Sequence, residues 1–116
     1  MRFAVEVRGV AIGHSELEHA DTGMGVAVGA FVPTAAYGTV QPVFQRFADG
    51  ESQSYYEARD ALALQLRGMD GKVLSTQWIH IADFERELGP GHAQLEVALK
   101  CIDDWRQYFD VRAKGN

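Results

Sequence analysis

The sequence predicts an α+β domain with a mainly antiparallel sheet of about five strands, in the order β-β-β-α-α-β-β-α, packed by roughly two or three helices. Three observations support this prediction. Segments with the alternation typical of half-buried strands come before and after a central pair of helical segments, rather than alternating with helices one by one. Turns rich in glycine and proline separate these segments. The length of 116 residues fits a single domain over residues 1–116.

The N-terminal residues are predicted to form a β-hairpin. Residues 3–7 alternate between apolar positions and polar or small ones, which is the period of a half-buried strand. Arg8 and Gly9 then provide a turn into a second short strand over residues 10–12. The residues from 14 to 22 are mostly polar, so we expect a loop there.

A third strand and an interrupted helix follow. Residues 24–32 return to a strand, in which Gly25 and Gly29 indicate a bulge or a place where another backbone or a ligand comes close. Pro33 ends this strand and fits the first turn of a helix, which Pro42 kinks or restarts. The apolar stripe of this helix, at spacings of three and four, consists of Tyr37, Val40, Phe44 and Phe47.

The second half is predicted to contain a helix, two strands and a short final helix. Residues 54–57, Ser-Tyr-Tyr-Glu, match a capping box for a helix over 55–67, with Gly68 as its C-terminal cap. Residues 73–82 and 93–99 have the composition of strands. The final helix carries an aromatic face that either covers the sheet or forms an interface with another chain; its residues are Trp105, Tyr108 and Phe109.

Composition and charge argue against several classes of protein. The net charge is −5, and the 11 basic residues are scattered, whereas nucleic-acid binders gather theirs on a patch. No apolar run approaches the roughly 20 residues of a membrane-spanning helix, and no secretory pattern opens the sequence. The lone Cys101 indicates a reducing compartment. We therefore expect a soluble, cytoplasmic protein with neither nucleic acid nor membrane as its partner.

One segment is dense in groups that bind ligands. Residues 14–21 contain two imidazoles and three carboxylates, but His14 and His19 are five apart and share no face of a helix or strand, so no metal site is predicted. No catalytic residue or cofactor is indicated either, and His80 is interpreted as a hydrogen-bonded sheet histidine. Together with one tyrosine that is expected at a surface, the candidate ligand-binding residues are His14, Glu18, His19, Asp21 and Tyr56.

A resemblance to a protein group rests on residues between positions 17 and 33. These residues are Leu17-Glu18, Asp21, Met24-Gly25-Val26-Ala27, Gly29, Phe31 and Pro33. Over this quarter of the chain the sequence resembles short, uncharacterised bacterial proteins found among mobile gene cassettes of the integron type. The resemblance implies a bacterial origin and a small stand-alone product, and it implies no activity.

Three functions fit the sequence. The first is a non-catalytic interaction domain that self-associates as a homodimer, because two-fold dimers are the commonest oligomers and sheet edges need covering. The second is a protein that binds a small molecule, or a small enzyme, with an aromatic-lined pocket between sheet and helices and the 14–21 segment at its mouth. The third is an acidic inhibitor or antitoxin-like protein that blocks a basic partner protein.

Overall fold

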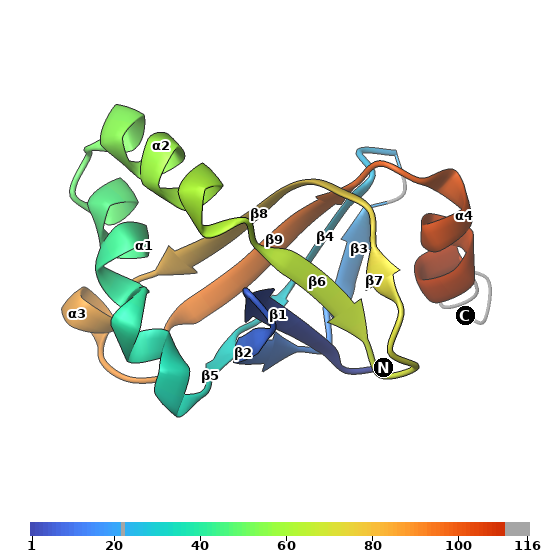
Figure 1. Ribbon diagram of the computed structural model, residues 1–116, viewed down its shortest axis with the longest axis horizontal. Helices are drawn as coiled ribbons and strands as arrows, with labels where there is room; N and C mark the ends of the chain where they lie inside the picture. The colour runs from blue at the N-terminus through green and yellow to red at the C-terminus, as the bar shows by residue number, and fades with distance from the viewer. Residues whose placement is uncertain (22, 111–116) are drawn as a thin grey trace.

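The computed structural model describes residues 1–21 and 23–110, and over these ranges it confirms the predicted α+β fold with antiparallel strand pairing (Figure 1). The strands divide between two sheets. Sheet 1 has the order β5-β2-β1-β6-β7 and consists of β1 (Phe3–Val7), β2 (Val10–Ser15), β5 (Val32–Pro33), β6 (Gln65–Gly68) and β7 (Val73–Leu74). Sheet 2 has the order β3-β4-β9-β8 and consists of β3 (His19–Asp21), β4 (Val26–Ala30), β8 (Thr76–Asp83) and β9 (Ala93–Leu99).

The helices gather at the two ends of the sheets (Figure 1). At one end lie α1 (Gln41–Ala48), α2 (Ser52–Leu62) and α3 (Glu85–Leu88), and at the other lies α4 (Ile102–Trp105), which a π-helical turn at Arg106–Asp110 extends. A 3₁₀ helix at Ala35–Thr39 precedes α1, and Pro42 lies in the first turn of α1, so the chain restarts its helix at this proline. None of the described helices is long and apolar enough to cross a membrane.

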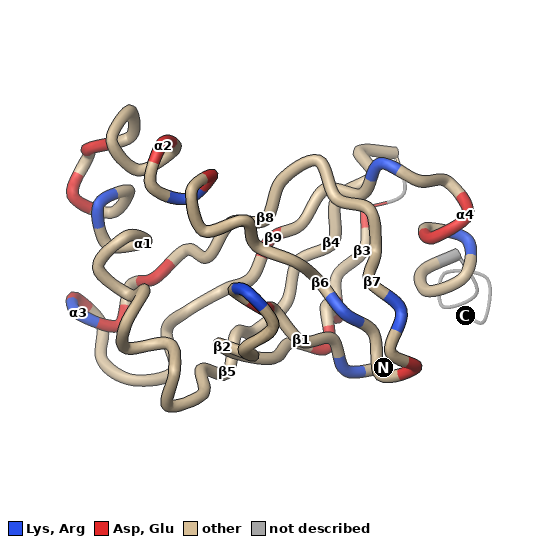
Figure 2. Tube along the Cα trace, viewed as in Figure 1, with Lys and Arg blue, Asp and Glu red and all other residues tan. Residues whose placement is uncertain are grey.

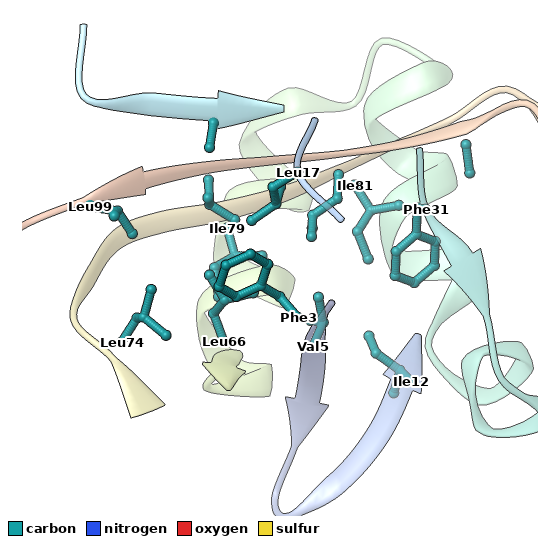
Figure 3. Close-up of a cluster of buried hydrophobic side chains, with 14 of the residues drawn as sticks. Phe3, Val5, Ile12, Leu17, Phe31, Leu66, Leu74, Ile79, Ile81 and Leu99 are labelled. Carbon is teal, nitrogen blue, oxygen red and sulfur yellow. The ribbon is translucent and has the colours of Figure 1, made fainter. Parts of the chain in front are cut away.

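The two sheets enclose a shared hydrophobic core (Figure 3). Phe3, Val5 and Leu66 enter this core from sheet 1, and Ile81 and Leu95 enter it from sheet 2; all five side chains are fully buried. Successive side chains point to opposite faces of a strand. Sheet 2 therefore has an inner face in the core and an outer face that points away from it.

The predicted N-terminal hairpin is confirmed. β1 pairs antiparallel with β2, with Val7 opposite Val10. Arg8 and Gly9 both have a left-handed backbone, with φ of 50° and 82°, as a two-residue turn between twisted strands requires. The interpretation of Gly29 as a place where another backbone comes close is also correct. A Cβ at Gly29 would lie 2.7 Å from the backbone of Leu17.

The expectation of a loop from 14 to 22 is wrong at both ends of the described part, residues 14–21, where the chain forms strands; Thr22 lies outside the described residues. His14 and the buried Ser15 end β2, and β3 follows after a short connection in which Leu17 is fully buried. All three residues of β3 are exposed, so no alternation of apolar and polar residues identifies this strand. Backbone pairing with β4 defines it, and such pairing leaves no local signal.

The helix predicted over 55–67 is displaced along the chain, because α2 covers Ser52–Leu62. Ala63, with φ of 51°, ends α2, whereas Gly68 was expected to do so. The residues beyond form β6, in which Leu66 lies opposite Val5 on β1. No side chain caps the start of α2 either, so the predicted capping box is wrong. Pairing with a distant strand here outweighs the local helical spacing.

The C-terminal aromatic face covers the chain's own sheet. Trp105, Tyr108 and Phe109 are 4%, 5% and 0% exposed. Phe3 on β1 stacks on Phe109 and meets Tyr108 edge-on, with ring centres 5.6 Å apart in both pairs. Of the two roles predicted for this face, the structure shows the first, and these side chains offer no exposed surface to a second chain.

Candidate functional site

An open cleft with a volume of about 840 Å³ lies on the outer face of sheet 2. Its floor comes from β4, β8 and β9, and its walls come from α1, α2 and the segment between β8 and β9. Figure 1 shows α1 and α2 at the end of the sheets opposite α4. Most of the lining surface is apolar. The lining residues are Glu18, His19, Gly29, Ala30, Phe47, Tyr56, Arg59, Trp78, His80, Ala82, Phe84, Leu88, Gly91, His92, Ala93, Gln94 and Glu96.

The floor of the cleft carries three ionisable side chains in one row across sheet 2, and the apolar Val28 interrupts this row. His80 on β8 lies opposite Glu96 on β9, and Glu96 lies opposite Val28 on β4. His19 on β3 extends the row, because it pairs with Val28. Residues directly opposite in antiparallel strands have Cβ atoms about 4.5–5.5 Å apart. The register of the sheet thus places the carboxylate of Glu96 beside the imidazole of His80 and two strands away from the imidazole of His19.

His80 is fixed by a contact with α2. Its Nδ1 lies 2.5 Å from the hydroxyl of Tyr55, whose side chain is fully buried, and the ring of Phe47 meets the imidazole edge-on at 4.7 Å. Burial lowers the pKa of His80 below its ordinary value of 6.5, and Glu96 partly opposes that effect. Burial also raises the pKa of Tyr55 to about 12. Both groups are therefore uncharged near neutral pH.

The walls of the cleft expose large apolar side chains. Phe47 is 39% exposed, Tyr56 and Phe84 are each 46% exposed, and Leu88 is 62% exposed. Trp78, on the floor, is half-buried. Aromatic rings in such positions offer flat faces on which a planar apolar group can stack.

Arg59 places a positive charge on the wall of the cleft. Its guanidinium lies over the rings of Tyr55 and Tyr56, 5.5 Å and 5.1 Å from their centres. The side chain is 16% exposed and forms an ion pair at 3.4 Å with the exposed Asp60. Stacking on two rings holds the guanidinium against the wall of the cleft.

Three of the residues predicted to bind a ligand line this cleft: Glu18, His19 and Tyr56. Glu18 lies at its edge, where its Oε2 accepts a hydrogen bond of 3.2 Å from the backbone N–H of Ala30. The density of polar groups predicts Glu18 and His19, and the position next to Tyr55 on a helix predicts Tyr56. The structure brings these distant parts of the chain together around one cavity.

The other two predicted residues, His14 and Asp21, lie outside the cleft. His14 belongs to β2 of sheet 1, opposite Ala4. Asp21 ends β3, and its Oδ1 accepts a hydrogen bond of 3.1 Å from the backbone N–H of Met24, which stabilises the turn into β4. Among the described residues, no group of three or more His, Cys, Asp or Glu side chains is arranged to hold a metal ion.

Sequence reasoning missed Arg59, His80 and Glu96 as cleft residues. The expectation that His80 is a hydrogen-bonded sheet histidine is correct, but its partner and its place on the cleft floor depend on α2. The alternation along β9 does carry a usable signal, because Gln94 and Glu96 are polar positions on one face of an otherwise apolar strand.

Comparisons of the chain with protein-family models, with curated proteins and with solved structures each gave no match. The resemblance to gene-cassette proteins stays a prediction.

Proposed function

We propose that this protein binds a small organic molecule in the cleft on the outer face of sheet 2. The observation that carries this proposal is the combination of a volume of about 840 Å³ with a mostly apolar lining and a few polar groups that converge on the floor. Ligand pockets commonly have volumes of about 300–1,000 Å³ and this kind of lining. The ligand would be largely apolar and partly planar, so that it stacks among Phe47, Tyr56 and Trp78.

The polar groups of the floor would orient such a ligand. His80 is held by Tyr55 at 2.5 Å, so its ring is fixed before a ligand arrives. The floor is built on paired strands, which position side chains more rigidly than loops do. Binding to a preformed site loses less conformational entropy than ordering the site on binding.

The other two functions receive less support from the arrangement of side chains. The aromatic face that motivated self-association is buried in the chain's own core. Figure 2 shows acidic and basic residues interspersed along the trace, whereas an acidic inhibitor needs its carboxylates gathered on one side. The homodimer remains a second proposal, which rests on the apolar side chains exposed around the cleft.

We also propose that the protein works in the cytoplasm. Its lone cysteine, Cys101, is half-buried and unpaired, which suits a reducing compartment.

A fragment screen by NMR tests the proposed function. We expect several planar fragments with Kd values of roughly 0.1–1 mM to shift the indole N–H resonance of Trp78 and the ring resonances of His80. An Ala30→Trp variant places an indole inside the cleft and should weaken these shifts. Ala20→Trp is the matched control, because Ala20 is exposed on β3 and does not line the cleft.

Two results would contradict the proposal. One is a screen in which no fragment moves the resonances of the cleft. The other is a set of hits that Ala30→Trp and Ala20→Trp retain equally, which would place binding elsewhere on the surface.

A further inference from the structure

We propose that the ligand of this cleft is a cation, specifically a flat aromatic compound with a positively charged nitrogen, and that Glu96 is the residue that selects it. This inference rests on the proposed small-molecule function and adds the chemical class of the ligand. It follows from the surroundings of Glu96, from the aromatic walls and from the other charges of the cleft.

Glu96 is a half-buried carboxylate on the floor of a mostly apolar cleft. Its one hydrogen bond to another described residue is accepted by Oε2 from the side-chain amide of Gln94, at 3.1 Å. Among residues 1–21 and 23–110, none of the ion pairs includes Glu96. A carboxylate that is partly removed from water without a cationic partner gains from a positive charge placed beside it.

The aromatic side chains of the cleft favour the same kind of ligand. Phe47, Tyr56 and Trp78 line the cavity together with Glu96. The faces of aromatic rings are electron-rich and attract cations within about 6 Å of the ring centre. A flat cationic ligand would use these rings twice, for apolar stacking and for attraction to its charge.

The remaining charges of the cleft do not cancel this preference. Arg59 is stacked on two tyrosine rings and paired with the exposed Asp60. Its charge does reach the floor, where it lowers the pKa of His80, but the opposite effect of Glu96 on that imidazole is the larger of the two. Glu18, the second carboxylate, accepts a hydrogen bond from a backbone N–H at the edge of the cleft. The imidazole of His80 is uncharged near neutral pH, because burial lowers its pKa. The net charge of −5 also attracts cations to the molecule as a whole.

Two dyes that differ in charge provide the test. Thioflavin T is a flat benzothiazolium cation, and the benzothiazole that lacks its ring N-methyl group is neutral and nearly the same shape. Equilibrium dialysis should show that the native protein binds the cationic dye more tightly by roughly fivefold or more, which corresponds to a cation–π contact supported by a carboxylate.

Substitutions then assign the preference to one residue. In Glu96→Gln the two dyes should bind within about twofold of each other, whereas Glu96→Asp, which keeps the charge, should retain the preference. Glu57→Gln is the matched control, since it removes the same charge from an exposed position of α2 outside the cleft. It should leave the preference unchanged.

Several results would overturn this inference. Equal binding of the two dyes to the native protein would do so, and so would an equal loss of preference in Glu57→Gln and Glu96→Gln, which would reduce the effect to net charge. Binding of the neutral dye alone, weakened by Ala30→Trp, would reject the cation and leave the binding function standing. If neither dye binds, the cationic aromatic class is rejected, and the fragment screen decides the binding function separately.

Discussion

The two faces of sheet 2 are made by the same strands and have opposite properties. On the inner face, Ile81, Leu95 and Val97 are fully buried against sheet 1. On the outer face, His80 and Glu96 alternate with them and line an open cleft. One face is thus a packed core, and the other combines apolar and ionisable groups that a core does not tolerate without partners.

This difference follows from what covers each face. The inner face packs against sheet 1 in the shared core, and at its Asp83 end Tyr37 and Gln41 cover it. On the outer side, α1 packs against β8 at the edge of the sheet, and α2 packs against α1. Tyr55 of α2 reaches the outer face at His80, but the side chains of β9 next to it remain half-buried or exposed. The inner face therefore contributes buried apolar contacts, and the outer face leaves aromatic and ionisable side chains accessible in the cleft.

A second chain bound to the outer face would remove the difference between the two faces, because it would bury the outer face as well. The homodimer is still a prediction; because Trp105, Tyr108 and Phe109 are buried, a dimer would use the exposed Phe84 and its apolar neighbours around the cleft. A dimer with a Kd near 1 μM corresponds to about 8 kcal/mol of association free energy and would bury above about 1,000 Å².

Sedimentation equilibrium checks the homodimer. A homodimer that uses this face would have a mass of twice 12.8 kDa; Phe84→Ser would weaken it, whereas Ile102→Ser, at an exposed position on α4, would not. Because such a dimer would cover the cleft, it is the alternative to the proposed ligand binding, which requires the monomer. A constant mass of 12.8 kDa across the micromolar range would show that the outer face is open in solution.

Neighbouring substitutions on β9 compare the two faces directly. Leu95→Ala should lower the free energy of unfolding by roughly 2–5 kcal/mol, because Leu95 is fully buried and its removal leaves a cavity. Gln94→Ala, next to it on the outer face, should change that free energy by less than about 0.5 kcal/mol. Urea denaturation measures both, and similar losses in the two variants would mean that the outer face is packed as tightly as the inner one.

A substitution at Gly29 tests how closely the segment with Ser15 and Leu17 approaches β4 of sheet 2. A Cβ at this position would lie 2.5 Å from Ser15 Oγ and 2.7 Å from the backbone of Leu17, so Gly29→Ala should destabilise the protein by roughly 1–3 kcal/mol. Gly38→Ala is the control, since no atom lies within 4 Å of a Cβ there. Thermal unfolding distinguishes the two, and equal melting temperatures would refute the close approach.

The sequence predicts those parts of the fold in which the pattern is local. Residues 3–7 and 93–99 alternate strictly, and both are strands with the predicted bounds. Leu66 shows where local pattern fails: it lies four residues after Leu62, which suggests a helix, yet it pairs with Val5, far away in sequence. Pairing between distant strands depends on the whole fold and has no local signature.

The residues of the candidate site also fall into two groups: those that a local pattern predicts and those that only the complete fold brings to the cleft. Tyr56 could be predicted because it lies about 100° around a helix from the buried Tyr55. Glu18 and His19 could be predicted from a local density of polar groups. Glu96 and Arg59 could not be assigned to the same cavity, because only the register of sheet 2 and the position of α2 bring them to the cleft.

The smallest expected effect is a pH dependence that originates on the outer face. The pKa of His80 lies below 6.5 in the folded chain because the imidazole is buried. Between that lowered pKa and 6.5, the unfolded chain holds more protons at this residue than the folded chain does, so the free energy of unfolding rises with pH through this window. The contribution of His80 to the free energy of unfolding is thus complete above pH 6.5 and is lost as the pH falls.

NMR titration of the His80 ring should give a midpoint below 6.5. Glu96→Gln should lower this midpoint further and Arg59→Met should raise it, because these two charges act on the imidazole with opposite signs. A midpoint at or above 6.5 would show that burial does not dominate at His80, and shifts in the reverse directions would show that Glu96 and Arg59 do not act on its imidazole as the cleft arrangement requires.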